Sequence, residues 1–93
     1  MMYSEFLELT GLAENQVDPK IYFLEIEPLY MDSPSAITKD LFCRQWTKFF
    51  DENMSDFVKR IDKDIYKNVN KKMVAQIIIL VTIGLMKDLF KLL

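Results

Sequence analysis

Hydrophobic residues recur every three or four positions along most of this chain, which is the spacing of one face of an α-helix. Residues that favour helix ends divide the pattern into segments. Gly11 suits a left-handed stop, while Asp18, Thr38 and Ser55 suit helix starts. The pattern predicts an all-α fold, a small bundle of four to five helices over residues 4–11, 19–31, 38–52, 55–69 and 72–91.

The second predicted helix contains Pro28, which cannot donate a backbone N–H. We therefore expect a kink there, or two short helices that meet at Glu27. Residues 21–26 are rich in β-branched and aromatic side chains and could also form a strand. The capping signal at Asp18 and Pro19 favours the helix.

The last third of the chain changes character near residue 70. The fourth predicted helix carries one apolar line, made of Val58, Ile61, Ile65 and Val69. Residues 73–86 then carry no charge, and the thin polar stripe of the fifth helix points close to where that apolar line points. Either the helix breaks near residue 70 or one continuous helix has different partners at its two ends. Asn68 and Asn70 are poor helix-interior residues, so they favour the break.

Composition limits the chain to one domain, residues 1–93, and excludes several classes of function. Hydrophobic residues make up 51% of the chain and charged residues 28%, which is a globular composition. There is one cysteine, Cys43, and no histidine. The usual zinc sites and Ser-His or Cys-His nucleophiles therefore cannot form, and we expect no enzyme activity, metal or cofactor. The lone thiol and the absence of a signal-peptide pattern predict a cytoplasmic protein.

Charge is distributed unevenly along the chain. Residues 1–57 hold eleven acidic and four basic side chains, whereas residues 58–93 hold three and eight. The fourth predicted helix therefore has a basic stripe that could contact nucleic acid, formed by Arg60, Lys63, Lys67, Lys71 and Lys72. Asp62 and Asp64 interrupt it, so a solvated helix face is the favoured interpretation.

The apolar segment near the end of the chain raises the question of a membrane. Fourteen uncharged residues rise only about 21 Å as a helix, whereas about 20 residues are needed to span a bilayer. A buried core or oligomer helix is therefore favoured over peripheral membrane association through residues 73–93. The candidate interface residues are Tyr30, Trp46, Ile79 and Leu80, the last two for self-association.

Short motifs in residues 4–46 resemble small helical proteins of unsettled function that phages and prophages encode. The resemblance is carried by Glu5-Phe6, Leu9-Thr10-Gly11, Tyr22, Ile26-Glu27-Pro28, Tyr30-Met31, Lys39 and Phe42-Cys43. It implies a mobile-element context, in which such proteins often bind a host or phage protein. The sequence thus predicts a non-enzymatic protein-interaction or regulatory protein with an unidentified protein partner, expected to form a homo-oligomer. The rival hypothesis is a nucleic-acid-binding regulator.

Overall fold

Every regular element of the structure is helical. The computed structural model describes residues 1–93 and contains no strand. In chain order the elements are α1 (Tyr3–Thr10), α2 (Pro19–Ile21), the π-helical turn η1 (Tyr22–Ile26), α3 (Glu27–Met31), α4 (Lys39–Arg60), α5 (Lys63–Asn68) and α6 (Lys71–Leu92). The predicted all-α class is confirmed, and the strand considered for residues 21–26 is helical instead.

Three of the predicted helix ends are formed by the expected residues. Gly11 adopts a left-handed conformation with φ 73° at the end of α1. The Asp18 carboxylate accepts a 2.9 Å hydrogen bond from the backbone N–H of Lys20, and Thr38 Oγ1 accepts one of 3.2 Å from Leu41. These side chains satisfy amide groups that a helix start leaves unpaired.

Pro28 does not interrupt the second helix, because the turn before it widens. The backbone N–H of Glu27 donates to the carbonyl of Tyr22, five residues earlier, where an α-helix would use the fourth. A proline ring crowds the carbonyl four residues before it, and a π-helical turn gives that carbonyl room. In place of the predicted kink or pair of separate short helices, the helix runs on and changes type at Glu27, where η1 passes into α3.

The predicted division between residues 52 and 55 is wrong. α4 continues without a break through this region to Arg60. Asn53 stays inside the helix because its Nδ2 donates a 2.7 Å hydrogen bond to the carbonyl of Phe49. Met54 and Phe57 pack against the core, which outweighs the modest helix preference of asparagine and serine. Ser55 is exposed and begins no helix.

The predicted fourth helix, residues 55–69, is split between the end of α4 and the short helix α5. The chain is extended at Ile61, and the Asp62 carboxylate accepts a 2.8 Å hydrogen bond from Asp64 N–H at the start of α5. The expected apolar line therefore does not form. Val58 and Ile65 from that line are exposed.

The predicted break near residue 70 is confirmed. Val69 is extended, and Asn70 Oδ1 accepts hydrogen bonds from the backbone N–H groups of Lys72 at 3.0 Å and Met73 at 3.3 Å. Asparagine is a preferred residue at this position before a helix. α6 therefore begins as a separate helix with its own direction.

The core joins α1, the helix over residues 19–31, α4 and α6. Phe6 of α1 lies 5.4 Å from the ring centre of Tyr22 and 5.3 Å from that of Trp46. Phe42 of α4 lies 6.0 Å from Phe90 of α6. Edge-to-face and tilted ring pairs at these distances add to the stabilisation from burial.

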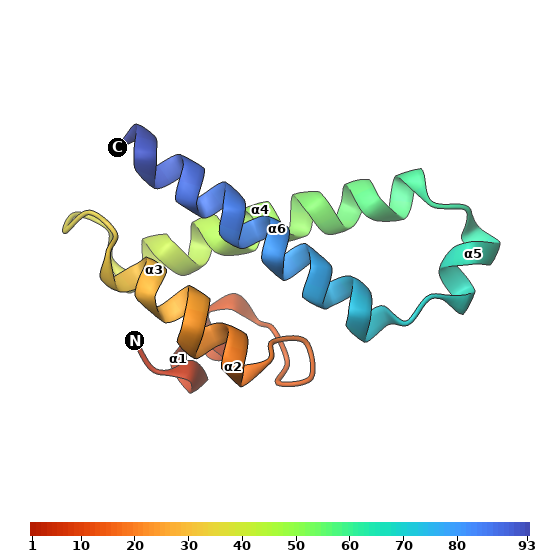
Figure 1. The fold of residues 1–93 in the computed structure, drawn as a ribbon, viewed down its shortest axis with the longest axis horizontal. Helices are drawn as coiled ribbons and strands as arrows, with labels where there is room; N and C mark the ends of the chain where they lie inside the picture. Colours follow the sequence, from red (N-terminus) through yellow and green to blue (C-terminus); the bar gives the residue numbers. More distant parts are fainter.

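α4 and α6 run in opposite directions and cross, and α5 connects them at one end of the molecule (Figure 1). α5 contains no buried residue. The principal extents of 45 × 27 × 19 Å reflect this elongated shape. The aromatic core lies at the opposite end of the molecule. One face of α6 packs on the core, and the other face of α6 is exposed.

Candidate interaction surface

The inner face of α6 is part of the core. Its buried residues recur at helical spacing and are Val74, Ala75, Ile78, Ile79, Thr82, Ile83 and Met86. The one polar member, Thr82, donates a 2.7 Å hydrogen bond from Oγ1 to the carbonyl of Ile78. Its hydroxyl group is therefore satisfied, and this face packs as apolar surface.

The opposite side of α6, which we call the outer face, is apolar but exposed. It consists of Met73, Ile77, Leu80, Val81 and Gly84. The exposed fractions of its side chains are 58% for Met73, 53% for Ile77, 54% for Leu80 and 42% for Val81. Single exposed apolar residues are normal, but four within three turns of one helix form a contiguous patch that is typical of a contact surface.

Charged side chains continue the same side of α6 beyond the apolar patch. Lys87, Asp88 and Lys91 are exposed, and Lys72 is exposed before the patch. The Lys87 ammonium group lies 3.5 Å from the Glu25 carboxylate, and both side chains are about half exposed. An exposed pair of this kind contributes little to stability, so Lys87 is free to exchange its partner.

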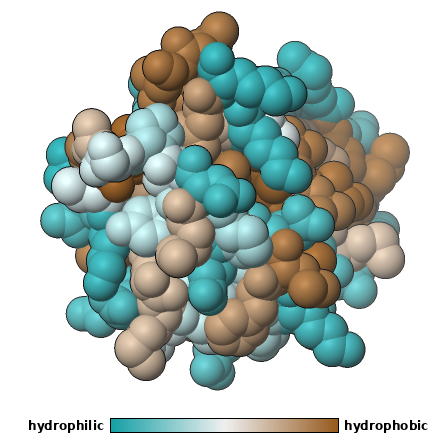
Figure 2. All heavy atoms as spheres, turned by 60° about the vertical axis from the view of Figure 1, so that its left-hand side comes forward, coloured by the Kyte–Doolittle hydropathy of each residue, from teal (hydrophilic) through white to brown (hydrophobic).

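The helix over residues 19–31 lies beside α6 near Leu80. A shallow hollow of about 130 Å³ lies between them, lined by Asp18, Ile21, Gln76, Ile79 and Leu80. Leu24, on the same helix, is strongly exposed. Figure 2 shows one face of the molecule, with hydrophobic groups at the top and along the right-hand side of that view and hydrophilic groups between them.

The structure separates the four predicted interface residues. Trp46 and Ile79 are 0% and 1% exposed, so they are core residues and not surface anchors as predicted. Tyr30 is half-buried, with its ring 5.2 Å from that of Phe42. Leu80 alone lies on the outer face of α6. The other members of that face were not predicted, although positions 73, 77, 80 and 84 follow the three-and-four spacing of a helix contact.

The basic residues do not form one stripe along one helix, as the sequence predicted. Arg60 ends α4, Lys63 and Lys67 belong to α5, and Lys71 and Lys72 begin α6. All five are exposed. They gather at the α5 end of the molecule, because two chain breaks redirect the helices that carry them (Figure 1).

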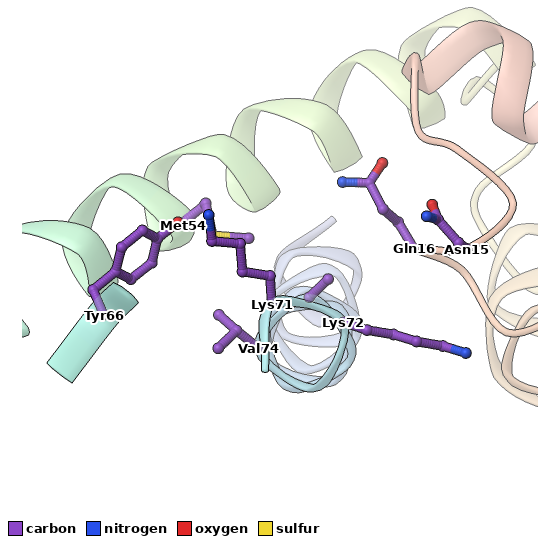
Figure 3. A pocket seen from close by; sticks show the side chains of 8 residues that line it. Asn15, Gln16, Met54, Tyr66, Lys71, Lys72 and Val74 are labelled. Carbon is purple, nitrogen blue, oxygen red and sulfur yellow. The ribbon is translucent and has the colours of Figure 1, made fainter. Parts of the chain in front are cut away.

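A second hollow, of about 390 Å³, lies at this end of the molecule. It is lined by Asn15, Gln16, Met54, Tyr66, Lys71, Lys72, Val74 and Ala75. The Lys71 ammonium group lies 5.3 Å from the centre of the Tyr66 ring, a cation–π contact. Lys71 extends toward Met54 and Tyr66, whereas Lys72 extends to the other side (Figure 3). No carboxylate lines this hollow.

α6 has 22 residues, whereas its uncharged stretch covers only residues 73–86. By length and composition alone it could cross a membrane, although 39% of its most apolar part is buried inside the fold. The core helix of a soluble protein meets the same criterion of length and composition, so this criterion does not distinguish the two. The exposed outer face of α6 is the more specific sign of a contact surface. No group of three or more acidic or cysteine side chains is placed to hold a metal ion.

The resemblance to phage-encoded proteins involves residues that build the fold. Phe6, Tyr22, Ile26 and Phe42 from its motifs are all buried, while the outer face of α6 lies outside the matching segment. These motifs therefore belong to the core and not to the candidate surface. A comparison with known proteins finds no matching family model, no significantly similar curated protein and no significantly similar solved structure.

Proposed function

We propose that this chain is a non-enzymatic helical interaction protein that binds another protein chain through the outer face of α6. The observation that carries the proposal is the exposure of Met73, Ile77, Leu80 and Val81 on a helix whose other face is core. Covering these side chains removes apolar surface from water, which is the main driving force of association. Helices commonly bind partners through residues at this spacing.

The surroundings of the outer face support recognition by a protein. Lysines lie at both ends of the patch, Lys72 before it and Lys87 and Lys91 after it. An apolar centre with a charged rim is the usual arrangement of a protein interface, where the centre provides affinity and the rim provides orientation. The helix that carries the patch is fixed by its packing on α4, so little order is lost on binding.

The single thiol supports a reducing cytoplasmic setting for this activity. Cys43 is buried, and burial raises the pKa of its thiol to about 11. The thiol therefore stays protonated near neutral pH and is a poor nucleophile. A phage or prophage origin remains part of the proposal, with support from the sequence resemblance in residues 4–46.

The proposal is tested by placing a photo-crosslinking residue on the outer face. We expect the substitution at Ile77 to give discrete crosslinked protein bands in native host cells. The matched control is the same residue at Lys48, which is exposed on α4 away from α6. No bands from position 77, or the same bands from both positions, would overturn the proposal.

Peripheral membrane association is the second candidate, because α6 is long and apolar and has lysines at both ends. It predicts that the protein sediments with vesicles containing anionic lipid, and that Ile77→Asp prevents this. Protein that stays in the supernatant at low salt would exclude this candidate and leave the protein-binding proposal intact.

A further inference from the structure

The glycine on the outer face of α6 has no role inside the fold. Gly84 lies in the middle of the helix, and a Cβ atom added there would meet no heavy atom within 4 Å. Glycine weakens a helix interior, so a glycine that nothing in the fold requires needs another explanation. A second helix whose backbone approaches closely from outside would explain the glycine, because Gly84 is on the exposed side of α6 beside Ile77 and Leu80.

Ile77, Gly84 and Lys91 are seven residues apart and form a line along the outer face of α6. Two pairs of neighbouring residues straddle this line, with one member of each pair on either side. At roughly 100° per residue, Leu80 and Lys87 fall on one side of that line and Val81 and Asp88 on the other. The first pair, Leu80 and Val81, is apolar, and the second, one heptad later, carries opposite charges. Asp88 is the one acidic residue of α6.

We propose that the occupant of the outer face is a second copy of this chain, whose α6 packs against the first in parallel, crossing at Gly84. In a parallel pair related by a two-fold axis, the side of one helix that carries Leu80 and Lys87 faces the side of the other helix that carries Val81 and Asp88. Leu80 then packs on Val81 of the partner subunit, and Lys87 faces Asp88 of the partner subunit. Symmetry forms each contact twice. The inference rests on the proposed function, since it names the partner of the same surface.

An antiparallel pair crossing at Gly84 fits the side chains poorly. In the antiparallel pair each side of one helix would face the same side of the other helix. Leu80 would then lie against the partner's Lys87, and Val81 against the partner's Asp88. Burying a charge against apolar surface without a counter-charge is unfavourable. The parallel arrangement matches Leu80 with Val81 and Lys87 with Asp88. It also brings the two Lys91 residues together across the axis, but these lie in the exposed last turn of α6, where both ammonium groups can extend into water. Lys87 has to leave its exposed contact with Glu25.

Sedimentation equilibrium of charge-reversal variants tests the pairing. Wild type should reach twice the 11.0 kDa monomer mass with rising concentration. Lys87→Asp and Asp88→Lys should each weaken self-association by about tenfold or more, because two like-charge contacts form. An equimolar mixture of the two variants should associate again, since each then supplies the charge that the other needs. Glu25→Gln should not weaken the dimer, because it removes only the contact that Lys87 leaves when the pair forms. Lys48→Asp, a charge reversal at an exposed position of α4, is the control and should leave the dimer unchanged.

A wild-type protein that stays monomeric at high concentration overturns this proposal, and so does a variant mixture that associates no better than its components. If the wild type is monomeric while position 77 still crosslinks to a different protein, the proposed function stands and only this inference fails. If position 77 gives no crosslinks at all, both fail.

The direction of the pair is tested by Lys91→Cys and by Gly84→Leu. In the parallel pair the two substituted positions at Lys91 lie across the two-fold axis, so a disulfide-linked dimer should form under mild oxidation. Wild type is the control, because its one thiol, at Cys43, is buried. Gly84→Leu should abolish the dimer by holding the helices apart. Absence of the disulfide in a protein that still dimerises, or a dimer that tolerates Gly84→Leu, would overturn the parallel crossing.

Discussion

Tyr22 donates a 2.7 Å hydrogen bond from its hydroxyl group to the backbone carbonyl of Met1. This contact fixes residues 1 and 2 against η1 from within the core, where Met1 Sδ also lies 3.6 Å from Cys43 Sγ. Burial, the largest effect, and the Glu27 carboxylate raise the pKa of Tyr22 to about 12. The same packing that orders the first residues therefore keeps this phenol neutral.

The raised pKa values predict a loss of stability at alkaline pH. Above pH 10 the unfolded chain releases the Tyr22 proton from a group of ordinary pKa 10.0, whereas the folded chain holds it to about pH 12. The free energy of unfolding therefore falls as pH rises through this range, and the stabilisation is complete only below pH 10. Cys43 acts in the same direction between pH 9.0 and about 11.

Urea unfolding at a series of pH values from 7 to 11 measures this effect. Tyr22→Phe should be less stable by about 1 kcal/mol at pH 7, because it loses the hydrogen bond to Met1. Its further loss of stability above pH 10 should be smaller than that of the wild type, since the titrating group is gone. Parallel pH curves for the two proteins would contradict the assignment to Tyr22.

Trp46→Ala should destabilise the protein strongly. The indole ring is fully buried, and its ring packs edge-on against Phe6 of α1. Loss of its apolar surface and the cavity that remains should cost about 3–5 kcal/mol in urea unfolding. Leu41→Ala on the same helix is the control and should cost less than about 1 kcal/mol, because Leu41 is nearly half exposed. Equal losses in the two variants would mean that Trp46 is not in the core.

Asn70→Ala should weaken the start of α6. Asn70 Oδ1 accepts from two backbone N–H groups, and alanine cannot replace these bonds. We expect a loss of about 1 kcal/mol in thermal or urea unfolding, with full recovery in Asn70→Asp, because aspartate is an equally good cap. If Asn70→Asp is as unstable as Asn70→Ala, the asparagine has some role other than capping.

The two glycines should respond to alanine in opposite directions. Gly11 has φ 73°, where an alanine Cβ is strained, so Gly11→Ala should lower stability by about 1 kcal/mol or more. Gly84 is helical with open space around it, so Gly84→Ala should raise monomer stability by up to about 1 kcal/mol. Dilute samples keep association out of this comparison, and a loss of stability in Gly84→Ala would show that its surroundings are not open.

Binding of the basic end of the molecule to DNA should be weak. Arg60, Lys63 and Lys67 are interleaved with Asp62 and Asp64, which repel phosphate. We expect little retention on generic DNA at low salt, and little change after Lys63, Lys67 and Lys71 are each replaced by glutamate. Strong binding that falls steeply with salt and is lost in this triple variant would favour the nucleic-acid hypothesis over the protein-interaction proposal.

Local features of the sequence determined the fold class and several helix ends. Gly11, Asp18 and Thr38 act through bonds and backbone angles within a few residues, so their effects could be predicted without the rest of the structure. The break near residue 70 was also predictable, because Asn70 caps α6 through its nearest amides. These are short-range effects, and the sequence alone contains them.

Tertiary packing decided the continuity of α4 and the choice between neighbouring apolar residues. Met54 and Phe57 keep α4 helical past Asn53 by packing on the core, a contact that local preference does not reveal. Ile79 and Leu80 are adjacent and equally apolar, yet one is buried and the other lies on the outer face of α6. The direction in which α6 crosses α4 makes that choice. Periodicity identifies the two faces of a helix, but only the partner helix determines which one is covered.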